Sequence, residues 1–253
     1  MTARPAALVT GSARGIGRAA ALALAEHGYD VAVNYAVSEA AARQVADEVR
    51  GRGAAALVVQ ADVADEPAVA RMAGAVADAF GRLDALVNNA GVTIDVAAAD
   101  LDAVTAADWD RIFAVNVRGT FQVTRACLPL LRRAARPAVV NVASIAGLRP
   151  GPQPLPYAAS KAAVVNLTRT LAGALGPAVR VNAVAPGWME GEWMRARLGE
   201  DYDRLMERRA RMTPLRRCVT AAEVAATIVS LITSNPFVTG EVVVVDGGYS
   251  AVT

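Results

Sequence analysis

Short apolar runs alternate with longer stretches of helical periodicity along the whole chain. The apolar runs predict strands at residues 6–9, 31–34, 55–60, 85–88, 138–144, 179–185 and 241–246. The stretches between them predict helices at residues 15–27, 38–50, 66–80, 105–131, 157–175 and 220–233. Short strands separated by helices pair in parallel through right-handed crossovers. The pattern therefore predicts an α/β fold, a single doubly wound domain over residues 1–253, with a parallel sheet of about seven strands and helices on both faces.

Residues 188–213 depart from this alternation. They are helical in composition, contain two of the three tryptophans and lie between the last long strand and the last long helix. The segment is interpreted either as a lid inserted over a partly apolar substrate or as a helical pair that packs on the domain or on another subunit. Four alternating prolines between residues 150 and 156 stiffen another loop, which we expect to form a second wall of the substrate pocket.

Composition narrows the function classes. The chain is 54% hydrophobic and 20% charged, which excludes a disordered chain. Its 26 basic and 24 acidic residues leave a net charge of +2, so no nucleic-acid partner is expected. No apolar signal core precedes the first strand, and the uncharged stretch at 224–240 is broken by Pro236, so no membrane partner is expected. Cys127 and Cys218 have no paired spacing, which favours a reduced, cytoplasmic protein.

Two basic residue types occur once each. His27 is the single histidine, so a zinc site built on several histidines is excluded, and a Ser-His-Asp triad would have to use this residue. It lies in the last turn of the first predicted helix, where we expect neither a catalytic role nor a metal site. Lys161 is the single lysine, whereas the other members of the 26 lysines and arginines are all arginine.

A glycine-rich turn follows the first strand. Gly11, Gly15 and Gly17 lie where the chain passes from a strand into a helix. Glycines there permit a tight turn and let backbone N–H groups approach a pyrophosphate, and the helix N-terminus adds partial positive charge. The alternative is that these glycines only allow close packing of helix and strand. The context of strand and helix favours dinucleotide binding.

Tyr157 and Lys161 are four residues apart, so on a helix they share one face. A tyrosine has a reference pKa of about 10, and a nearby ammonium lowers it by favouring the phenolate. Ser144, at the end of a strand, is placed to hydrogen-bond a substrate carbonyl, or to cap a local turn. Asn116 is an unfavourable residue inside a helix, which indicates a kink, a bound water or a buried hydrogen bond.

The order and spacing of these motifs resemble the short-chain dehydrogenase/reductase family over nearly the whole chain. The matching strings are T-G-x-x-x-G-x-G at 10–17, D-V at 62–63, N-N-A-G at 88–91, P-G at 186–187, T-G at 239–240 and V-D-G-G at 245–248. Within the family the chain looks most like the 3-oxoacyl-acyl-carrier-protein reductases. The resemblance implies a Rossmann-like fold.

The resemblance also implies roles for four catalytic positions. Tyr157 is the general acid/base, Lys161 lowers its pKa and holds the nicotinamide ribose, Ser144 polarises the carbonyl, and Asn116 supports a water relay. The implied cofactor-binding residues are Gly11, Ser12, Arg14, Gly15, Ile16, Gly17, Asn34, Tyr35, Ser38, Asp62, Val63, Asn89, Ala90, Gly91, Tyr157, Lys161, Pro186 and Gly187. A threonine that contacts the nicotinamide in many members is replaced here by Gly191.

The second predicted strand points to NADP rather than NAD. In NAD-selective folds an acidic residue at the end of this strand binds the adenine ribose hydroxyls. Here Asn34, Tyr35 and Ser38 stand in that region, and none of them would repel a ribose 2′-phosphate. Arg14 in the glycine turn is placed to reach the same phosphate through its forked donors.

The sequence thus predicts an NADPH-dependent carbonyl reductase or alcohol dehydrogenase for a 3-oxoacyl thioester or related ketone. Two alternatives stay open: a sugar or polyol dehydrogenase using NAD(P), and a non-catalytic nucleotide-sensing protein. A cluster of Arg132, Arg133 and Arg136 is either a solvated helix end or a docking site for a carrier-bound acyl chain. By the resemblance, the helices of Asn116 and Tyr157 are expected to be buried in a homotetramer, a dimer of dimers.

Overall fold

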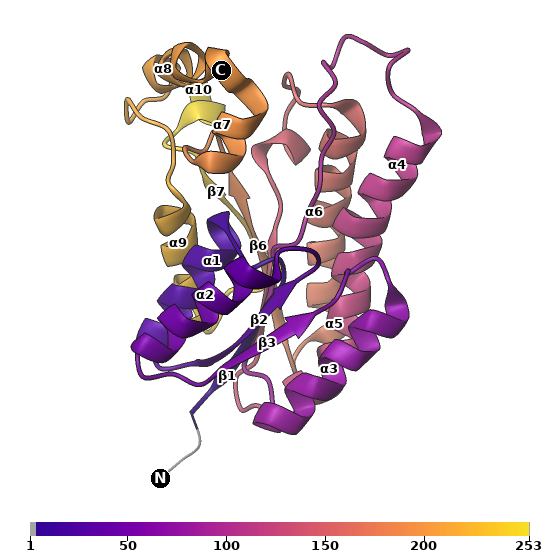
Figure 1. Ribbon diagram of the computed structural model, residues 1–253, viewed down its shortest axis with the longest axis vertical. Coiled ribbons are helices and arrows are strands. Elements are labelled where there is room, and N and C mark those ends of the chain that lie inside the picture. The colour runs from indigo at the N-terminus through magenta and orange to yellow at the C-terminus, as the bar shows by residue number, and fades with distance from the viewer. Residues whose placement is uncertain (1–3, 253) are drawn as a thin grey trace.

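The computed structural model describes residues 4–252 and contains one seven-stranded sheet between two layers of helices (Figure 1). The strands are β1 (Ala6–Val9), β2 (Asp30–Tyr35), β3 (Ala56–Gln60), β4 (Ala85–Asn88), β5 (Ala138–Val142), β6 (Arg180–Pro186) and β7 (Val242–Val245). Their order is β3-β2-β1-β4-β5-β6-β7, and every neighbouring pair is parallel. The predicted single-domain, doubly wound fold is confirmed.

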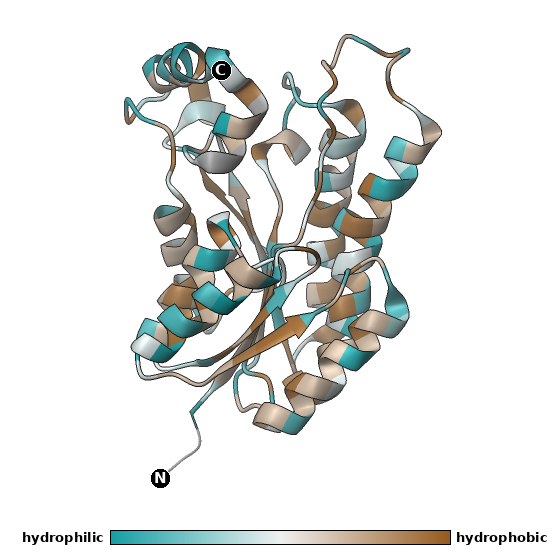
Figure 2. Ribbon diagram, viewed as in Figure 1, coloured by the Kyte–Doolittle hydropathy of each residue, from teal (hydrophilic) through white to brown (hydrophobic). Residues whose placement is uncertain are grey.

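The helices divide between the two faces of the sheet (Figure 1). One face carries α1 (Gly15–Glu26), α2 (Glu39–Gly51) and α9 (Ala221–Thr233), and the other carries α3 (Glu66–Phe80), α5 (Thr120–Leu131) and α6 (Leu155–Leu175). Neighbouring residues of a strand serve opposite faces: Val9 packs with the α1, α2 and α9 layer, whereas Leu8 packs with the α3 and α5 layer. Apolar residues therefore line the sheet on both sides (Figure 2).

Local capping sets several helix boundaries. Thr105 and Asp108 form a capping box at the start of α4 (Ala106–Phe113), and Thr220 and Glu223 form another at the start of α9. The predicted helix at 105–131 is not regular throughout. A π-helical segment, η1 (Ala114–Gly119), separates α4 from α5. The chain follows the predicted course there, but with a wider turn that contains Asn116.

The strand predicted at 138–144 is shorter than expected. It ends at Val142, because Ser144 caps the short 3₁₀ helix η2 (Ile145–Gly147) by accepting a hydrogen bond from the N–H of Ala146 at 3.2 Å. The helix predicted to begin at Tyr157 begins earlier, at Leu155, with Pro156 in its first turn, where a missing N–H costs nothing.

The segment that departs from the alternation forms α7 (Glu192–Leu198), η3 (Gly199–Asp201) and α8 (Tyr202–Met212), which lie together with α10 (Tyr249–Val252) beyond the carboxyl ends of β6 and β7 (Figure 1). Met194, Tyr202, Met206 and Cys218 make a small apolar cluster of their own there. Among residues 4–252, no helix combines the length and apolarity needed to cross a bilayer.

Candidate active site

The glycine-rich turn joins β1 to α1 in a conformation that side chains would obstruct. Gly11 and Gly15 have φ of +61° and +57°, in the left-handed region that favours glycine. A Cβ at Gly17 would lie 2.5 Å from both Asn89 Nδ2 and the Gly11 carbonyl oxygen. Asn89 fixes the turn from the end of β4 by donating to the carbonyl oxygens of Thr10 and Gly11. Close packing and an exposed backbone cradle therefore coexist, and the cradle fits a dinucleotide pyrophosphate.

Asn34 supports this turn from inside the protein. Its side chain is 1% exposed, accepts a hydrogen bond from the N–H of Gly11 at 3.0 Å and donates to the carbonyl oxygen of Ala61 at 3.1 Å. Ser12 is also fully buried and donates to the backbone oxygen of Asn34. The side chains of Asn34 and Ser12 thus hold the glycine turn against the ends of the strands. This structural role was not predicted from the sequence, which placed both residues at the cofactor.

Other predicted adenosine-side residues differ in exposure. Tyr35 is 7% exposed, whereas Arg14, in the glycine turn, and Ser38, just after β2, are exposed. Asp62 accepts hydrogen bonds from the N–H of Ala64 and from Arg111, an ion pair of 3.1 Å. These contacts fix the loop after β3 to α4.

Val63 and Gly119 pack tightly against each other. A Cβ at Gly119 would lie 2.7 Å from a methyl carbon of Val63, so this glycine in the π-helical segment permits the contact. Gln122 adds a hydrogen bond of 2.9 Å to the carbonyl oxygen of Val63. The predicted adenine-side pair is therefore positioned by the same helix that carries Asn116.

Lys161 is buried rather than a surface lysine. It is 5% exposed, and its Nζ donates a hydrogen bond of 2.7 Å to the backbone oxygen of Val142. Nζ lies 5.7 Å from the centroid of the Tyr157 ring, so the predicted shared face of the helix is confirmed. Burial lowers the pKa of the Lys161 ammonium to about 8. The cation and the half-buried phenol therefore form one site.

Gly91 marks the point where this pair meets the cofactor cradle. A Cβ at Gly91 would lie 3.5 Å from Lys161 Nζ and 3.4 Å from Asn116 Oδ1. Ala90, one residue earlier, donates its N–H to Thr10 Oγ1 at 3.1 Å. The N-N-A-G string thus connects the glycine turn to the lysine, and the two predicted sites are a single site.

Asn116 uses its whole amide for hydrogen bonds within the protein. Its Oδ1 accepts from the N–H of Val92 at 2.8 Å, and its Nδ2 donates to the carbonyl oxygen of Val92 and to Ser160 Oγ. Ser160 Oγ in turn donates to the backbone oxygen of Tyr157 at 2.7 Å. The π-helical segment, the loop after β4 and the first turns of α6 are thereby joined.

Ser144 and Tyr157 are held in register by a glycine that sequence reasoning did not assign a role. A Cβ at Gly147 would lie 2.5 Å from the backbone carbon of Lys161, so η2 rests directly on α6. The contact places half-buried Ser144 at the end of β5 beside the Tyr157 helix. For Gly147, the sequence signal was a glycine that follows Ser144 closely. For Ser160, which also had no assigned role, the signal was a polar residue on an apolar helix.

Gly187 and Gly191 shape the chain after β6. A Cβ at Gly187 would lie 2.5 Å from the Cβ of Asp246, so this glycine lets the end of β6 contact the C-terminal segment. Gly191 has φ of +130°, a conformation that a threonine would adopt only with strain. Its N–H donates to the hydroxyl of Tyr202.

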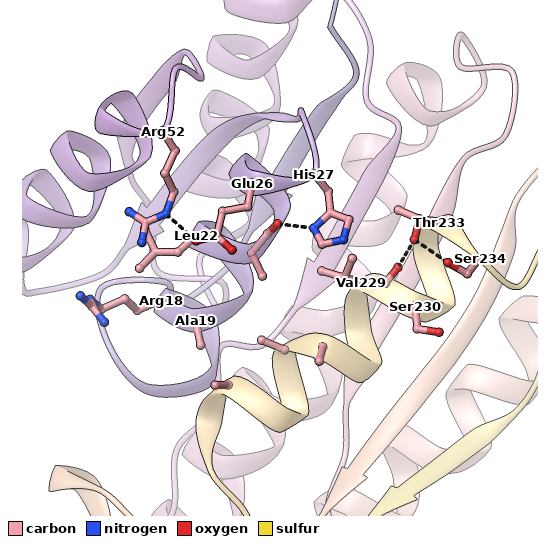
Figure 3. Close-up of a pocket in the computed structure, with 14 residues that line it drawn as sticks. Arg18, Ala19, Leu22, Glu26, His27, Arg52, Val229, Ser230, Thr233 and Ser234 are labelled. Atoms are coloured by element: carbon pink, nitrogen blue, oxygen red, sulfur yellow. Dashed lines mark hydrogen bonds and ion pairs between the residues drawn. The ribbon is translucent and has the colours of Figure 1, made fainter.

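Two cavities lie in the part of the chain that the structure describes, and of these the smaller one lies next to a predicted catalytic residue. A cavity of about 70 Å³ lies next to Ser144, between η2, the proline-rich loop, Trp188 and Tyr249. A larger one of about 520 Å³ lies between α1 and α9 and contains none of the four predicted catalytic residues (Figure 3). His27 lines the larger cavity, with its Nδ1 2.8 Å from the Ala23 carbonyl oxygen (Figure 3).

Comparison with known proteins agrees with this geometry. A family model described as enoyl-(acyl carrier protein) reductase matches residues 11–250. A granaticin polyketide synthase putative ketoacyl reductase 2 from Streptomyces violaceoruber is 44% identical over 96% of this chain and 95% of its own length. The 3-oxoacyl-[acyl-carrier-protein] reductase FabG of Staphylococcus epidermidis is 37% identical over 96% of this chain and 97% of its own length.

Solved structures share the fold closely. A gluconate 5-dehydrogenase from Burkholderia cenocepacia J2315, in complex with NADP and tartrate, superposes with a TM-score of 0.89 at 32% identity, covering 98% of this chain and 96% of that one. The likeness thus spans the sheet, the helical layers and the segment above them. The chain belongs to the short-chain dehydrogenase/reductase family and is an NAD(P)-dependent oxidoreductase acting on alcohol or carbonyl groups.

Proposed function

We propose that the protein is an NADPH-dependent carbonyl reductase whose substrate is a 3-oxoacyl thioester or a related ketone. The observation that carries the proposal is the buried Lys161 ammonium beside Tyr157, next to Gly91 of the cofactor cradle. A cation at this place stabilises the phenolate form of tyrosine and so makes the hydroxyl a usable acid near neutral pH.

Three of the four residues have a direct chemical task in this proposal. Ser144 Oγ donates a hydrogen bond to the substrate carbonyl oxygen and orients it. The Tyr157 hydroxyl delivers a proton to that oxygen as the carbon is reduced. Lys161 compensates the negative charge left on Tyr157. When bound, the nicotinamide cofactor supplies the hydride.

Asn116 acts as a positioning residue in this proposal. Its amide is used by Val92 and Ser160, so it keeps α6 and the loop after β4 in register. A water relay to Lys161 would then depend on this packing rather than on a free Asn116 side chain. The residues that would hold the dinucleotide are those of the glycine turn, the N-N-A-G string and the Pro186–Gly187 pair.

The choice of NADPH rests on the edge of the sheet beside β2. Asn34 leaves this strand end without an acidic side chain, and Arg14 and Ser38 are exposed there. An arginine suits phosphate oxygens through its forked donors. The dehydrogenase from Burkholderia cenocepacia, which contains NADP, supports a phosphorylated dinucleotide.

Relatives support two substrate classes. The ketoacyl and 3-oxoacyl reductases favour an acyl thioester, whereas the gluconate 5-dehydrogenase favours the alternative of a sugar or polyol. The family membership and its oxidoreductase relatives argue against the non-catalytic alternative. NADPH oxidation against 3-oxoacyl thioesters, diketones, quinones and sugar ketones tests the proposal. Turnover of thioesters or simple ketones is expected, and turnover of sugars alone would overturn it.

A carrier-bound form of the substrate has weaker support. Arg132, Arg133 and Arg136 are exposed but precede β5, whereas Ser144 follows its end. A strand of this length spans roughly 17 Å. A carrier docked on the cluster would therefore face the edge of the sheet opposite to the Ser144 of the same chain, which favours a solvated helix end.

Assembly and location complete the proposal. We infer a homotetramer from the family resemblance, and we expect Phe121 on α5 and Leu155 on α6, which are 40% and 43% exposed, to lie at one of its interfaces. Val165 is 5% exposed within one chain, so a charge there would test folding rather than association. Light scattering on the wild type and on Phe121→Glu therefore tests association, and a monomeric wild type would overturn the inferred tetramer. Cys127 and Cys218 are buried free thiols, which supports the reducing cytoplasm.

A further inference from the structure

Ser160 is a buried polar residue on α6, between Tyr157 and Lys161, and it is 0% exposed. Two other hydroxyls on this helix, those of Thr168 and Thr170, donate to the carbonyl oxygen four residues earlier, which is a common arrangement inside helices. Ser160 Oγ donates instead to the carbonyl oxygen of Tyr157, three residues earlier, at 2.7 Å. The hydroxyl therefore contacts the backbone of the proposed proton donor directly.

The same hydroxyl receives a hydrogen bond from another element. Asn116 Nδ2, in the π-helical segment η1, donates to Ser160 Oγ at 2.9 Å. The two other hydrogen bonds of this amide join it to the backbone N–H and carbonyl oxygen of Val92. Val92 thus fixes the amide to the loop after β4, and the bond to Ser160 connects it to α6. Without the serine hydroxyl, the amide would still be held by Val92 but would lose its connection to the Tyr157 helix.

The start of α6 depends on such connections because it has no side-chain cap. Its N-cap residue, Pro154, makes no side-chain hydrogen bond to the first turn, which contains Tyr157. Lys161 and Gly147 tie α6 to β5 and to η2. Ser160 ties it to η1, so its hydrogen bonds complete the support of the turn that carries the phenol.

Burial makes the hydroxyl difficult to replace. Asn116 is 1% exposed, so its Nδ2 would lose an acceptor inside the protein if Ser160 became alanine. A compensating movement of α6 or of η1 would shift the phenol relative to the substrate carbonyl. A misplacement of about 1 Å costs up to about 10²-fold in rate.

We infer that Ser160 is a positioning residue for the reduction, whose hydroxyl links Asn116 to the Tyr157 backbone and so fixes the phenol against the substrate carbonyl. The inference rests on the proposed function. Its expected effect is on kcat rather than on cofactor binding, because the hydrogen bonds of Ser160 go to Asn116 and Tyr157 and not to the glycine turn.

The variant Ser160→Ala removes only the hydroxyl. With NADPH and ethyl 3-oxobutanoate we expect kcat to be about 10- to 100-fold below wild type, and the NADPH Kd from fluorescence titration to stay within about twofold of it. The matched control is Thr168→Val, which removes another fully buried hydroxyl on α6 that accepts from an asparagine, Asn141 Nδ2. Thr168 lies about 16 Å along the helix from Tyr157, so kcat should stay within about twofold of wild type.

Urea unfolding separates positioning from general loss of stability. Both Ser160→Ala and Thr168→Val should unfold at lower urea concentration than wild type, because each leaves a buried amide proton without its acceptor. Only Ser160→Ala should lose kcat. An equal loss of kcat in both variants, or a wild-type kcat in Ser160→Ala, would overturn the inference.

A second pair of variants serves if Ser160→Ala does not fold. Ser160→Thr and Ser160→Val introduce side chains of nearly the same shape, of which only threonine keeps the hydroxyl. We expect kcat to be at least tenfold higher in Ser160→Thr than in Ser160→Val. Equal values would contradict a role for the hydroxyl.

A double-mutant cycle with Asn116→Ala tests the connection between the two residues. Because both act through one hydrogen bond, their separate fold-losses in kcat should not multiply in the double variant. Losses that multiply would show independent roles and overturn the link. Absence of NADPH oxidation by the wild type with every class of ketone named above would instead overturn the proposed function, and the inference with it.

Discussion

The Lys161 ammonium donates a 2.7 Å hydrogen bond to the carbonyl oxygen of Val142, the last residue of β5. This bond fixes the catalytic face of α6 to the carboxyl end of the central sheet. It also keeps a cation in a buried place, where burial lowers the lysine pKa to about 8. The site therefore contains a charge that the fold tolerates at a cost, which is measurable.

The first prediction concerns that cost. In the unfolded chain the Lys161 pKa returns to about 10.5, so between about pH 8 and pH 10.5 the unfolded state binds the additional proton. Stability of the protein without cofactor should then rise with pH across this window relative to Lys161→Met, by up to about 3 kcal/mol. Urea unfolding of both proteins between pH 7 and pH 10 checks it. Parallel curves would show that Lys161 does not titrate with folding.

The second prediction concerns the proton donor. Tyr157→Phe should lower kcat by about 10²–10⁴-fold, because the proposal assigns proton delivery to this hydroxyl, while the cofactor Kd stays close to the wild-type value. Stopped-flow reduction and fluorescence titration with NADPH measure the two. Tyr29→Phe, on the opposite side of the sheet from the site, is the control and should keep kcat. Near-normal turnover in Tyr157→Phe would remove the proposed mechanism.

The third prediction concerns the contact between η2 and α6. Gly147→Ala places a Cβ 2.5 Å from the Lys161 backbone carbon, so we expect a shift of Ser144, a loss of kcat and a destabilisation of about 1–3 kcal/mol. Gly173→Ala is the matched control on α6, because a Cβ there meets nothing within 4 Å. It should stabilise the helix by up to about 1 kcal/mol and leave kcat unchanged. Equal effects from both variants would contradict the close approach.

How far the sequence predicts this molecule depends on the range of each interaction. The parallel sheet follows from local periodicity, and the capping box of Thr105 follows from residues three apart. The inward orientation of Asn34 and the contact at Gly147 follow from approaches between distant segments, which no local pattern contains. The π-helical turn at Asn116 is of the same kind, since its amide is satisfied by Val92 and Ser160 on other elements.

The last prediction concerns the dinucleotide. Arg14 is exposed in the glycine turn, and the neighbouring end of β2 has no acidic side chain to bind ribose hydroxyls or repel a phosphate. Wild type should therefore show a higher kcat/KM with NADPH than with NADH. Arg14→Ala should lower this ratio by about tenfold or more, because a charge-assisted hydrogen bond to a phosphate contributes about 1.5–3 kcal/mol.

The same reasoning predicts how the effect divides between the cofactors. Removal of the guanidinium should raise KM for NADPH and leave KM for NADH nearly unchanged, since only the former has a 2′-phosphate to lose a contact. Arg71→Ala, on α3, removes an equal charge elsewhere on the surface and should leave the ratio intact, which separates a local contact from a general electrostatic effect. A wild type that favours NADH, or a ratio untouched by Arg14→Ala, would show that this edge of the sheet does not bind the phosphate.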